Sequence, residues 1–206
     1  MSLNSHDIIK HVLKSLEDFD FILPEELPNI DLYMDQVTTF MEQHLSGTRR
    51  YPDDKILTKT MINNYAKNHL LPPPEKKKYT RDHLLLLIFI YYFKNIISIS
   101  DIDKLMSPIT KGSFKNQCYS LEDVYEMIFE LSHAQAEQLS RDILKQFNIA
   151  EESFPNATGS EAEYLHTFAL ICMLSFDVYL KKVTIEKLID ELPDLRNKDS
   201  KKKKDR

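Results

Sequence analysis

The residues of this sequence that are best suited to chemistry form one face of a short predicted helix in residues 58–71, TKTMINNYAKNHLL. Thr60, Asn63, Asn64 and Lys67 recur there at the i, i+3, i+4, i+7 spacing of a single helix face. Asn can bond the N6/N7 edge of adenine, Thr can contact a base or a thymine methyl group, and a nearby Lys can reach phosphate. Asn and Thr are weak helix formers, so their place on this helix face needs a reason. The alternative interpretation is that they are solvent-facing residues of a marginal helix.

A cationic segment follows this helix and favours the DNA-binding interpretation. The triple proline 72–74 ends the helix, because proline lacks the amide hydrogen and disfavours α geometry in the residue before it. Three lysines closed by a tyrosine come next: Lys76, Lys77, Lys78 and Tyr79. In an extended strand some of these lysines would face a nucleic-acid backbone, while the tyrosine anchors the strand or donates to a phosphate. An ordinary solvated loop is the alternative for such a run taken alone.

The region between Lys55 and His83 is basic, although the whole chain has a formal net charge of −5. Lysine and arginine contacts to phosphate require such a local excess of positive charge. From this region we predict a set of DNA-contacting residues: Lys59, Thr60, Asn63, Asn64, Tyr65, Lys67, Lys76, Lys77, Lys78, Tyr79 and Arg81.

Residues 58–71 resemble the recognition helix of MerR-type winged-helix regulators, which reads S-P-R-T-L-R-Y-Y-E-x-x-G-L-L followed by proline. The register fits without a gap, with Thr58 on the cap serine, Ile62 on the core leucine and Tyr65 on the second tyrosine. The pair Leu70-Leu71 falls on the leucines before proline, and Tyr79-Thr80 resembles the dipeptide that closes the wing. The resemblance extends roughly from residue 56 to 106. The arrangement is also similar to a family of uncharacterised bacterial proteins predicted to be MerR-like.

This resemblance implies a homodimer that reads two DNA half-sites, with one recognition helix in each major groove about 34 Å apart. The chain departs from the family pattern at several positions. The family arginines are replaced by Thr60 and Asn63, the first tyrosine by Asn64 and the glutamate by Ala66. The segment between Pro74 and Tyr79 is shorter than the usual wing. We therefore expect weaker DNA affinity or a different base preference than in a typical member.

The remaining elements predict a helical frame around this segment. Three glycines and the lack of alternating stretches argue against an all-β fold. The stretch 84–93 is apolar without interruption, which indicates a helix buried on several sides, and it is too short to span a membrane. The stretch 165–179 is also nearly all apolar and indicates a buried central helix or a dimer interface. We expect helices over residues 6–17, 31–45, 58–71, 81–97, 120–131, 133–147, 160–180 and 183–192, and a short helix that is capped by Ser98 or Ser100 and contains Ile102, Leu105 and Met106.

The predicted fold is all-α, or mainly α with a minimal β wing. Residues 1–27 would form an N-terminal helix and linker, and residues 28–112 a MerR-like winged-helix DNA-binding domain. Residues 113–195 would form a helical domain for dimerisation or signal input. The charge-rich tail 196–206 is predicted to be a disordered basic segment.

Catalysis finds little support in the sequence. It contains no glycine-rich phosphate loop, no His-x-x-x-His and no cysteine pair at zinc spacing, so we predict no enzyme, no catalytic residue, no metal site and no cofactor. Cys118 and Cys172 do not suggest a disulfide framework, and no signal peptide pattern is present. The predicted location is the cytoplasm, with no membrane association.

The predicted function is sequence-selective binding of double-stranded DNA by a transcriptional regulator. Two alternatives remain open. One is a protein-interaction module that uses the winged-helix shape against a protein partner, which the missing arginines and the acidic net charge favour. The other is a sensor whose C-terminal helices hold an unknown small-molecule effector, with DNA binding as its output.

Overall fold

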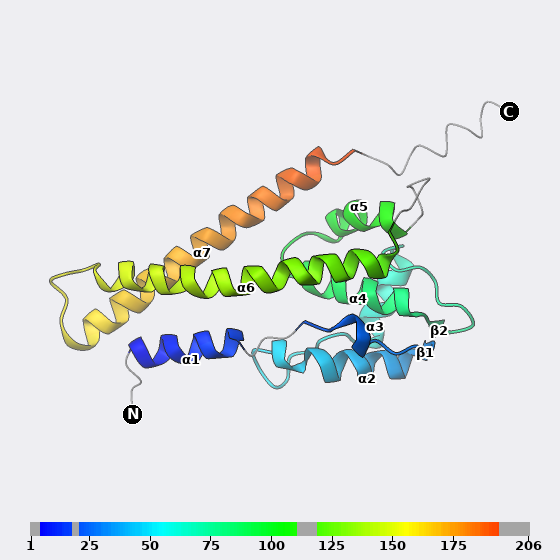
Figure 1. Ribbon diagram of the computed structural model, residues 1–206, viewed down its shortest axis with the longest axis horizontal. Helices are drawn as coiled ribbons and strands as arrows, with labels where there is room; N and C mark the ends of the chain where they lie inside the picture. The colour runs from blue at the N-terminus through cyan, green and yellow to red at the C-terminus, as the bar shows by residue number, and fades with distance from the viewer. Residues whose placement is uncertain (1–4, 18–20, 111–118, 194–206) are drawn as a thin grey trace. The chain divides into compact units, whose positions relative to one another are not determined.

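The computed structural model describes residues 5–17, 21–110 and 119–193. Cys118 and the predicted disordered tail lie outside the described residues. The fold is mainly helical with one small two-stranded sheet, which confirms the predicted class. The elements, labelled in Figure 1, are α1 (Ser5–Glu17), the 3-10 turn η1 (Pro24–Glu26), β1 (Leu32–Tyr33), α2 (Met34–Leu45), η2 (Ser46–Thr48), α3 (Lys59–Lys67), β2 (Lys78–Tyr79), α4 (Arg81–Phe93), α5 (Ile99–Thr110), α6 (Leu121–Glu151) and α7 (Gly159–Glu191).

The chain divides into two compact units. Unit 1 consists of Met1–Phe21 and Phe129–Thr184, and unit 2 of Ile22–Ile128 and Ile185–Arg206. The long helices α6 and α7 each contribute to both units. Unit 2 holds the segment in which we predicted the DNA-binding residues.

Helix α4 forms the centre of unit 2. Every residue from His83 to Tyr91 is buried, as the uninterrupted apolar run predicts. Neighbouring helices turn one apolar stripe toward it, such as Val37, Met41 and Leu45 on α2. Each fully buried Leu or Ile contributes roughly 1.5–3 kcal/mol of transfer free energy, so this core dominates the stability of the unit.

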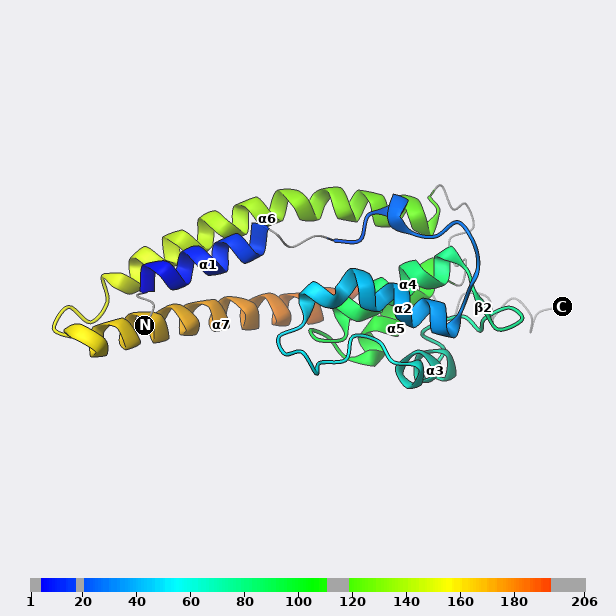
Figure 2. The same ribbon diagram turned by 90° about the horizontal axis from the view of Figure 1, so that it is seen from below.

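Strands β1 and β2 pair antiparallel, with Leu32 opposite Tyr79 and Tyr33 opposite Lys78. This pairing explains why α2 begins at Met34 and not at residue 31, as we predicted, because the preceding two residues belong to the strand. A further bridge joins Glu75 to Lys78 and closes a tight hairpin. Figure 2 shows this hairpin projecting from unit 2 beside α3.

The segment predicted as a linker at the end of residues 1–27 is part of the core of unit 2. Ile22, Pro24 and Leu27 are buried, and the Tyr125 hydroxyl donates a hydrogen bond of 2.6 Å to the Ile22 carbonyl. Prolines that interrupt helical periodicity do not by themselves indicate exposure, since a 3-10 turn accommodates them. The residues from 22 onward thus belong to the unit structurally.

Two predicted helix breaks are absent from the structure. Residues 121–151 form one helix where we predicted two, and residues 159–191 form another single helix. Neither stretch contains a proline, and the one glycine lies at the start of α7, so no residue forces an interruption. Helix α7 begins at Gly159, one residue before the predicted start.

Unit 1 has a small core, formed by Ile9, Ile143, Phe147, Ala150 and Leu170. The His6 ring contacts Phe147 edge-on, and its Nδ1 lies 3.2 Å from a carboxylate oxygen of Glu151. Many large apolar side chains of this unit remain exposed. On α7 these include Tyr164, Phe168, Ile171, Phe176, Val178, Tyr179 and Leu180.

Candidate nucleic-acid interface

Helix α3 presents the predicted polar stripe to solvent. The Thr58 hydroxyl caps the helix by accepting a hydrogen bond of 3.2 Å from the Met61 amide, as predicted. Ile62 and Tyr65 turn inward with exposed fractions of 0% and 8%, which anchors one side of the helix in the core. The four residues of the predicted base-reading face are all exposed: Thr60, Asn63, Asn64 and Lys67.

The C-terminal end of α3 is fixed by a Schellman motif centred on His69. The Leu70 amide donates to the Tyr65 carbonyl at 3.0 Å, and the His69 amide donates to the Ala66 carbonyl at 3.2 Å. His69 has a φ of 60°, a left-handed conformation that glycine adopts without cost. Leu70 and Tyr65 are both buried, so the motif turns the chain back into the core before the prolines.

The hairpin that follows carries two of the predicted lysines at its tip. Lys76 and Lys77 have φ angles of 49° and 68°, and the Lys78 amide donates to the Glu75 carbonyl at 2.8 Å. Two successive left-handed residues define the tight hairpin turn that usually contains Asn-Gly. Both lysine side chains are exposed, while Lys78 is half-buried with its Nζ atom 5.5 Å from the Tyr33 ring centroid. The hairpin therefore holds two cationic side chains outward on a defined turn.

The two predicted tyrosines are anchors within unit 2. Tyr65 and Tyr79 are buried, and burial raises the pKa of each phenol. The Tyr79 ring meets the His83 ring edge-on at 5.6 Å, which fits the predicted anchoring role and not the alternative of a phosphate donor. These positions are better described as supports of the stripe and the hairpin than as contacts.

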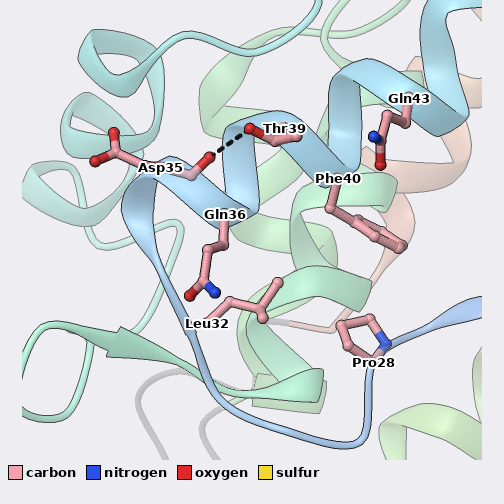
Figure 3. Close-up of a pocket in the computed structure, with 7 residues that line it drawn as sticks. All are labelled: Pro28, Leu32, Asp35, Gln36, Thr39, Phe40 and Gln43. Carbon is pink, nitrogen blue, oxygen red and sulfur yellow. Dashed lines mark hydrogen bonds between the residues drawn. The ribbon is translucent and has the colours of Figure 1, made fainter.

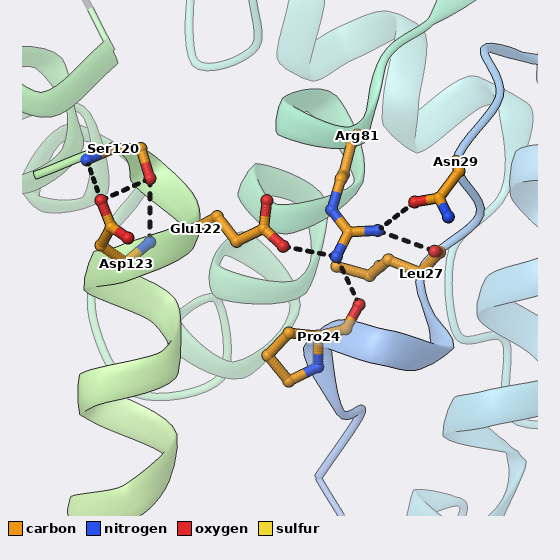
Figure 4. A network of polar contacts seen from close by, with 7 residues as sticks. All are labelled: Pro24, Leu27, Asn29, Arg81, Ser120, Glu122 and Asp123. Atoms are coloured by element: carbon orange, nitrogen blue, oxygen red, sulfur yellow. Dashed lines mark hydrogen bonds and ion pairs between the residues drawn. The ribbon is translucent and has the colours of Figure 1, made fainter.

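Two further predicted cations have protein partners. Lys59 forms an ion pair with Asp35 of α2. Arg81 is enclosed by acceptors: its Nη1 donates to the Leu27 carbonyl at 2.8 Å, and its Nη2 donates to the Pro24 carbonyl at 2.6 Å and to Glu122 at 2.5 Å (Figure 4). We therefore correct the role of Arg81, since its guanidinium ties the start of α4 to η1 and α6. A sequence cannot reveal such acceptors, because they are backbone carbonyls of distant residues.

A family model described as "Domain of unknown function (DUF1836)" matches residues 22–128, just over half of the chain. The chain belongs to this family. The matched residues coincide with the first segment of unit 2, so the DUF1836 region contains the core around α4, the stripe on α3 and the hairpin. Membership in a family of uncharacterised proteins is what the sequence predicted. No curated protein and no solved structure matches the chain.

His83 is a buried residue of the DUF1836 region that supports the hairpin, a role that was not predicted from the sequence. Its Nδ1 accepts a hydrogen bond of 3.1 Å from the Thr80 amide, so the ring proton resides on Nε2. Burial lowers the pKa of His83, while the Pro72 and Pro73 carbonyls and the carboxylates of Asp82 and Asp31 act in the opposite direction. The ring therefore caps the start of α4 through Nδ1 and packs edge-on against Tyr79 of the hairpin. The sequence feature that could have indicated this role is the spacing of three residues between Thr80 and His83, which is the spacing of a capping box.

A shallow groove runs along α2 on the surface of the DUF1836 region (Figure 3). Pro28, Leu32 and Phe40 supply its apolar floor, and amide and hydroxyl groups form its rim. The Thr39 hydroxyl donates a hydrogen bond of 2.9 Å to the Asp35 carbonyl, and this bond satisfies one rim group internally. The groove lacks a pair of groups suited to acid–base or nucleophilic chemistry.

Metal-binding clusters and membrane-spanning helices are both absent from the described part of the chain. No cluster of three or more His, Cys, Asp or Glu side chains suited to a metal ion occurs there. None of its helices combines the length and apolar character needed to cross a bilayer.

Proposed function

We propose that this protein binds double-stranded DNA through a winged helix-turn-helix and acts as a cytoplasmic transcriptional regulator. One observation carries the proposal: the polar stripe of α3 is exposed along the helix, and the neighbouring hairpin presents two exposed lysines. A nine-residue helix is about 14 Å long, which suits the major groove.

The proposed contacts follow from the exposed groups. Asn63 and Asn64 would read adenine, and Thr60 would contact a base or a thymine methyl group. Lys67, Lys76 and Lys77 would contact phosphates, which positions the helix without reading sequence. The absence of arginine on this face is consistent with a modest affinity, because Arg is the residue that forms bidentate contacts with guanine.

Kinship with MerR-type regulators is part of this proposal. The quoted motif has glycine at the position of His69, and His69 adopts the left-handed conformation that glycine favours. A strand leads into α2, and a hairpin follows α3, which is the order that a winged helix requires. Exposed apolar residues on α7 support a homodimer, since soluble proteins rarely leave such groups uncovered in one area.

The test begins by selecting genomic fragments that the purified full-length protein retains and measuring their affinity by fluorescence anisotropy. We expect Asn63→Ala and Asn64→Ala each to cost about 1–3 kcal/mol of binding free energy on the selected fragment and to blur base preference. The double variant Lys76→Gln/Lys77→Gln should weaken binding to all sequences and reduce the salt slope by about 0.9 for each lost phosphate contact.

Lys187→Gln serves as the matched control, because it removes one charge from an exposed residue of α7. Its affinity and salt slope should equal those of the wild type. Unchanged binding in both the asparagine and the hairpin variants would end the assignment.

A protein-interaction module is the second candidate, and the ion pair between Lys59 and Asp35 favours it. This carboxylate lies beside the start of α3 and would oppose an approaching phosphate. Binding of a protein that withstands high salt, with no DNA retained, would select this candidate. An α3 surface used in this way would still lose affinity on replacement of Asn63, so the salt dependence distinguishes the two functions.

A further inference from the structure

A second concentration of positive charge lies in a pocket of the DUF1836 region, between the connection 46–58 and the C-terminal end of α4. The pocket has a volume of about 270 Å³, just below the roughly 300–1,000 Å³ of sites for drug-sized ligands. Four cationic residues line it, Arg49, Arg50, Lys55 and Lys94, against one carboxylate, Asp54. We propose that this pocket binds an oxyanion of the phosphate class.

Lys94 forms the inner wall of the pocket. Its Nζ atom donates a hydrogen bond of 3.0 Å to the Ile56 carbonyl and lies 4.7 Å from the Tyr91 ring centroid. The Tyr91 hydroxyl is hydrogen-bonded to the Thr48 hydroxyl, which holds the Tyr91 ring in place. Burial lowers the pKa of Lys94, and a bound anion would act on this pKa in the opposite direction. The ammonium group retains further donors for a ligand, because it uses one on the carbonyl.

The outer wall carries cations that have few partners. Arg50 and Lys55 are exposed and have no carboxylate partner among the described residues, and the Arg50 guanidinium lies 5.2 Å from the Tyr51 ring centroid. Asp54 is already engaged, since it accepts a hydrogen bond of 2.9 Å from the Tyr51 amide. Arg49 is paired with Glu42, so its charge is largely balanced. The pocket therefore retains a surplus of donors and positive charge, which phosphate oxygens satisfy.

The position of the pocket allows two sources of phosphate. It lies at the opposite end of α4 from the hairpin, and thirteen helical residues span about 20 Å. It also borders the approach to α3, because Ile56 precedes the capping residue Thr58 by two positions. A free phosphate-containing anion and a backbone phosphate of bound DNA would both offer the required oxygens.

The test uses calorimetric titration and thermal melting of the full-length protein with inorganic pyrophosphate, compared with sodium chloride at equal ionic strength. We expect pyrophosphate to bind and to raise the melting temperature by a few degrees, as any ligand of the native state does. Arg50→Gln and Lys55→Gln alter exposed residues that the fold does not require, and each should weaken pyrophosphate binding about tenfold. Lys76→Gln on the hairpin removes the same charge away from the pocket and should leave the affinity unchanged.

A parallel measurement of DNA binding distinguishes the two sources of phosphate. If the pocket holds a backbone phosphate, both pocket variants weaken DNA binding and pyrophosphate competes with DNA. If the pocket holds a free anion, pyrophosphate does not compete with DNA. Both pocket variants then bind DNA with the affinity of the wild type. No binding of pyrophosphate to the wild type, or an equal loss in Lys76→Gln, overturns the proposal.

Discussion

Unit 1 and unit 2 use apolar residues in different ways. Unit 2 encloses an entire helix, α4, whose nine residues from His83 to Tyr91 are all buried. Among its described residues, unit 1 has a core of five buried residues, while Phe176, Val178 and Leu180 of α7 are 64–67% exposed. The contrast teaches that the apolar character of a helix does not determine its burial. Burial depends instead on how many neighbouring elements pack against the helix, and in unit 1 few elements pack against α7.

The largest expected effect tests this contrast directly. Leu87→Ala in α4 should lower the free energy of unfolding by about 2–5 kcal/mol, because it leaves a cavity in a fully packed site. Leu180→Ala in α7 should change it by no more than about 0.5 kcal/mol. Urea unfolding of both variants measures the difference. Similar losses in the two variants would show that the exposed surface of α7 is covered in solution.

The next largest predicted effect concerns the association of two copies of the chain. If a homodimer covers α7, Phe176→Ala and Tyr179→Ala should each raise the dimer dissociation constant at least about tenfold, since aromatic residues dominate interface energies. Sedimentation equilibrium measures this constant. Ile30→Ala, which removes an exposed apolar side chain from unit 2, is the control and should leave it unchanged. A wild-type protein that stays monomeric at high concentration contradicts the proposed dimer.

The network around Arg81 comes third and belongs to unit 2 alone. Arg81→Met keeps the aliphatic stem but removes the donors to the Pro24 and Leu27 carbonyls, which should cost about 1–3 kcal/mol of stability. Urea unfolding measures this loss. DNA affinity, measured at a temperature where the variant is fully folded, should be unchanged. A loss of affinity there would return Arg81 to the DNA-contacting set.

Stability should also depend on pH through His83. Because burial holds the pKa of His83 below its value in the unfolded chain, the native state binds fewer protons. Its contribution is therefore complete above pH 6.5 and is lost as the pH falls from about 6.5 toward the lowered pKa of the native state. Unfolding experiments between pH 5 and 8 should show this decline, and His83→Asn, which cannot titrate, should reduce it. Equal pH dependence in both proteins would exclude His83 as the cause.

The smallest effect is a gain in stability at the end of α3. His69→Gly should raise the free energy of unfolding by up to about 1–2 kcal/mol, because the φ of 60° costs histidine energy that glycine does not lose. His69→Ala is the matched control and should bring no gain, since alanine also has a Cβ atom. Thermal melting distinguishes the two variants. A gain in both would assign the effect to loss of the imidazole.

Much of the fold followed from local patterns. The cap at Thr58 and the burial of α4 were both predicted and are present in the structure. Each depends on residues close together in the chain, so the physical cause is visible in the sequence. Each of the two long helices was predicted as a pair of shorter helices, although neither stretch contains a proline or an internal glycine.

Part of the candidate site could likewise be predicted from local patterns in the sequence. The exposed stripe on α3 follows from helical periodicity, since one face with Ile62 and Tyr65 must pack and the opposite face must not. The lysines at the hairpin tip follow from the prolines and the charge run.

Only the tertiary structure decided which cations are free, because pairing depends on residues far away in the chain. Arg81 lies 57 positions from its partner Pro24, and Lys59 meets a carboxylate of another helix. The same holds for the pocket around Lys94, whose walls come from the connection 46–58 and from α4. Short-range hydrogen bonding and periodicity are encoded in consecutive residues, whereas charge neutralisation and cavities arise where distant segments meet.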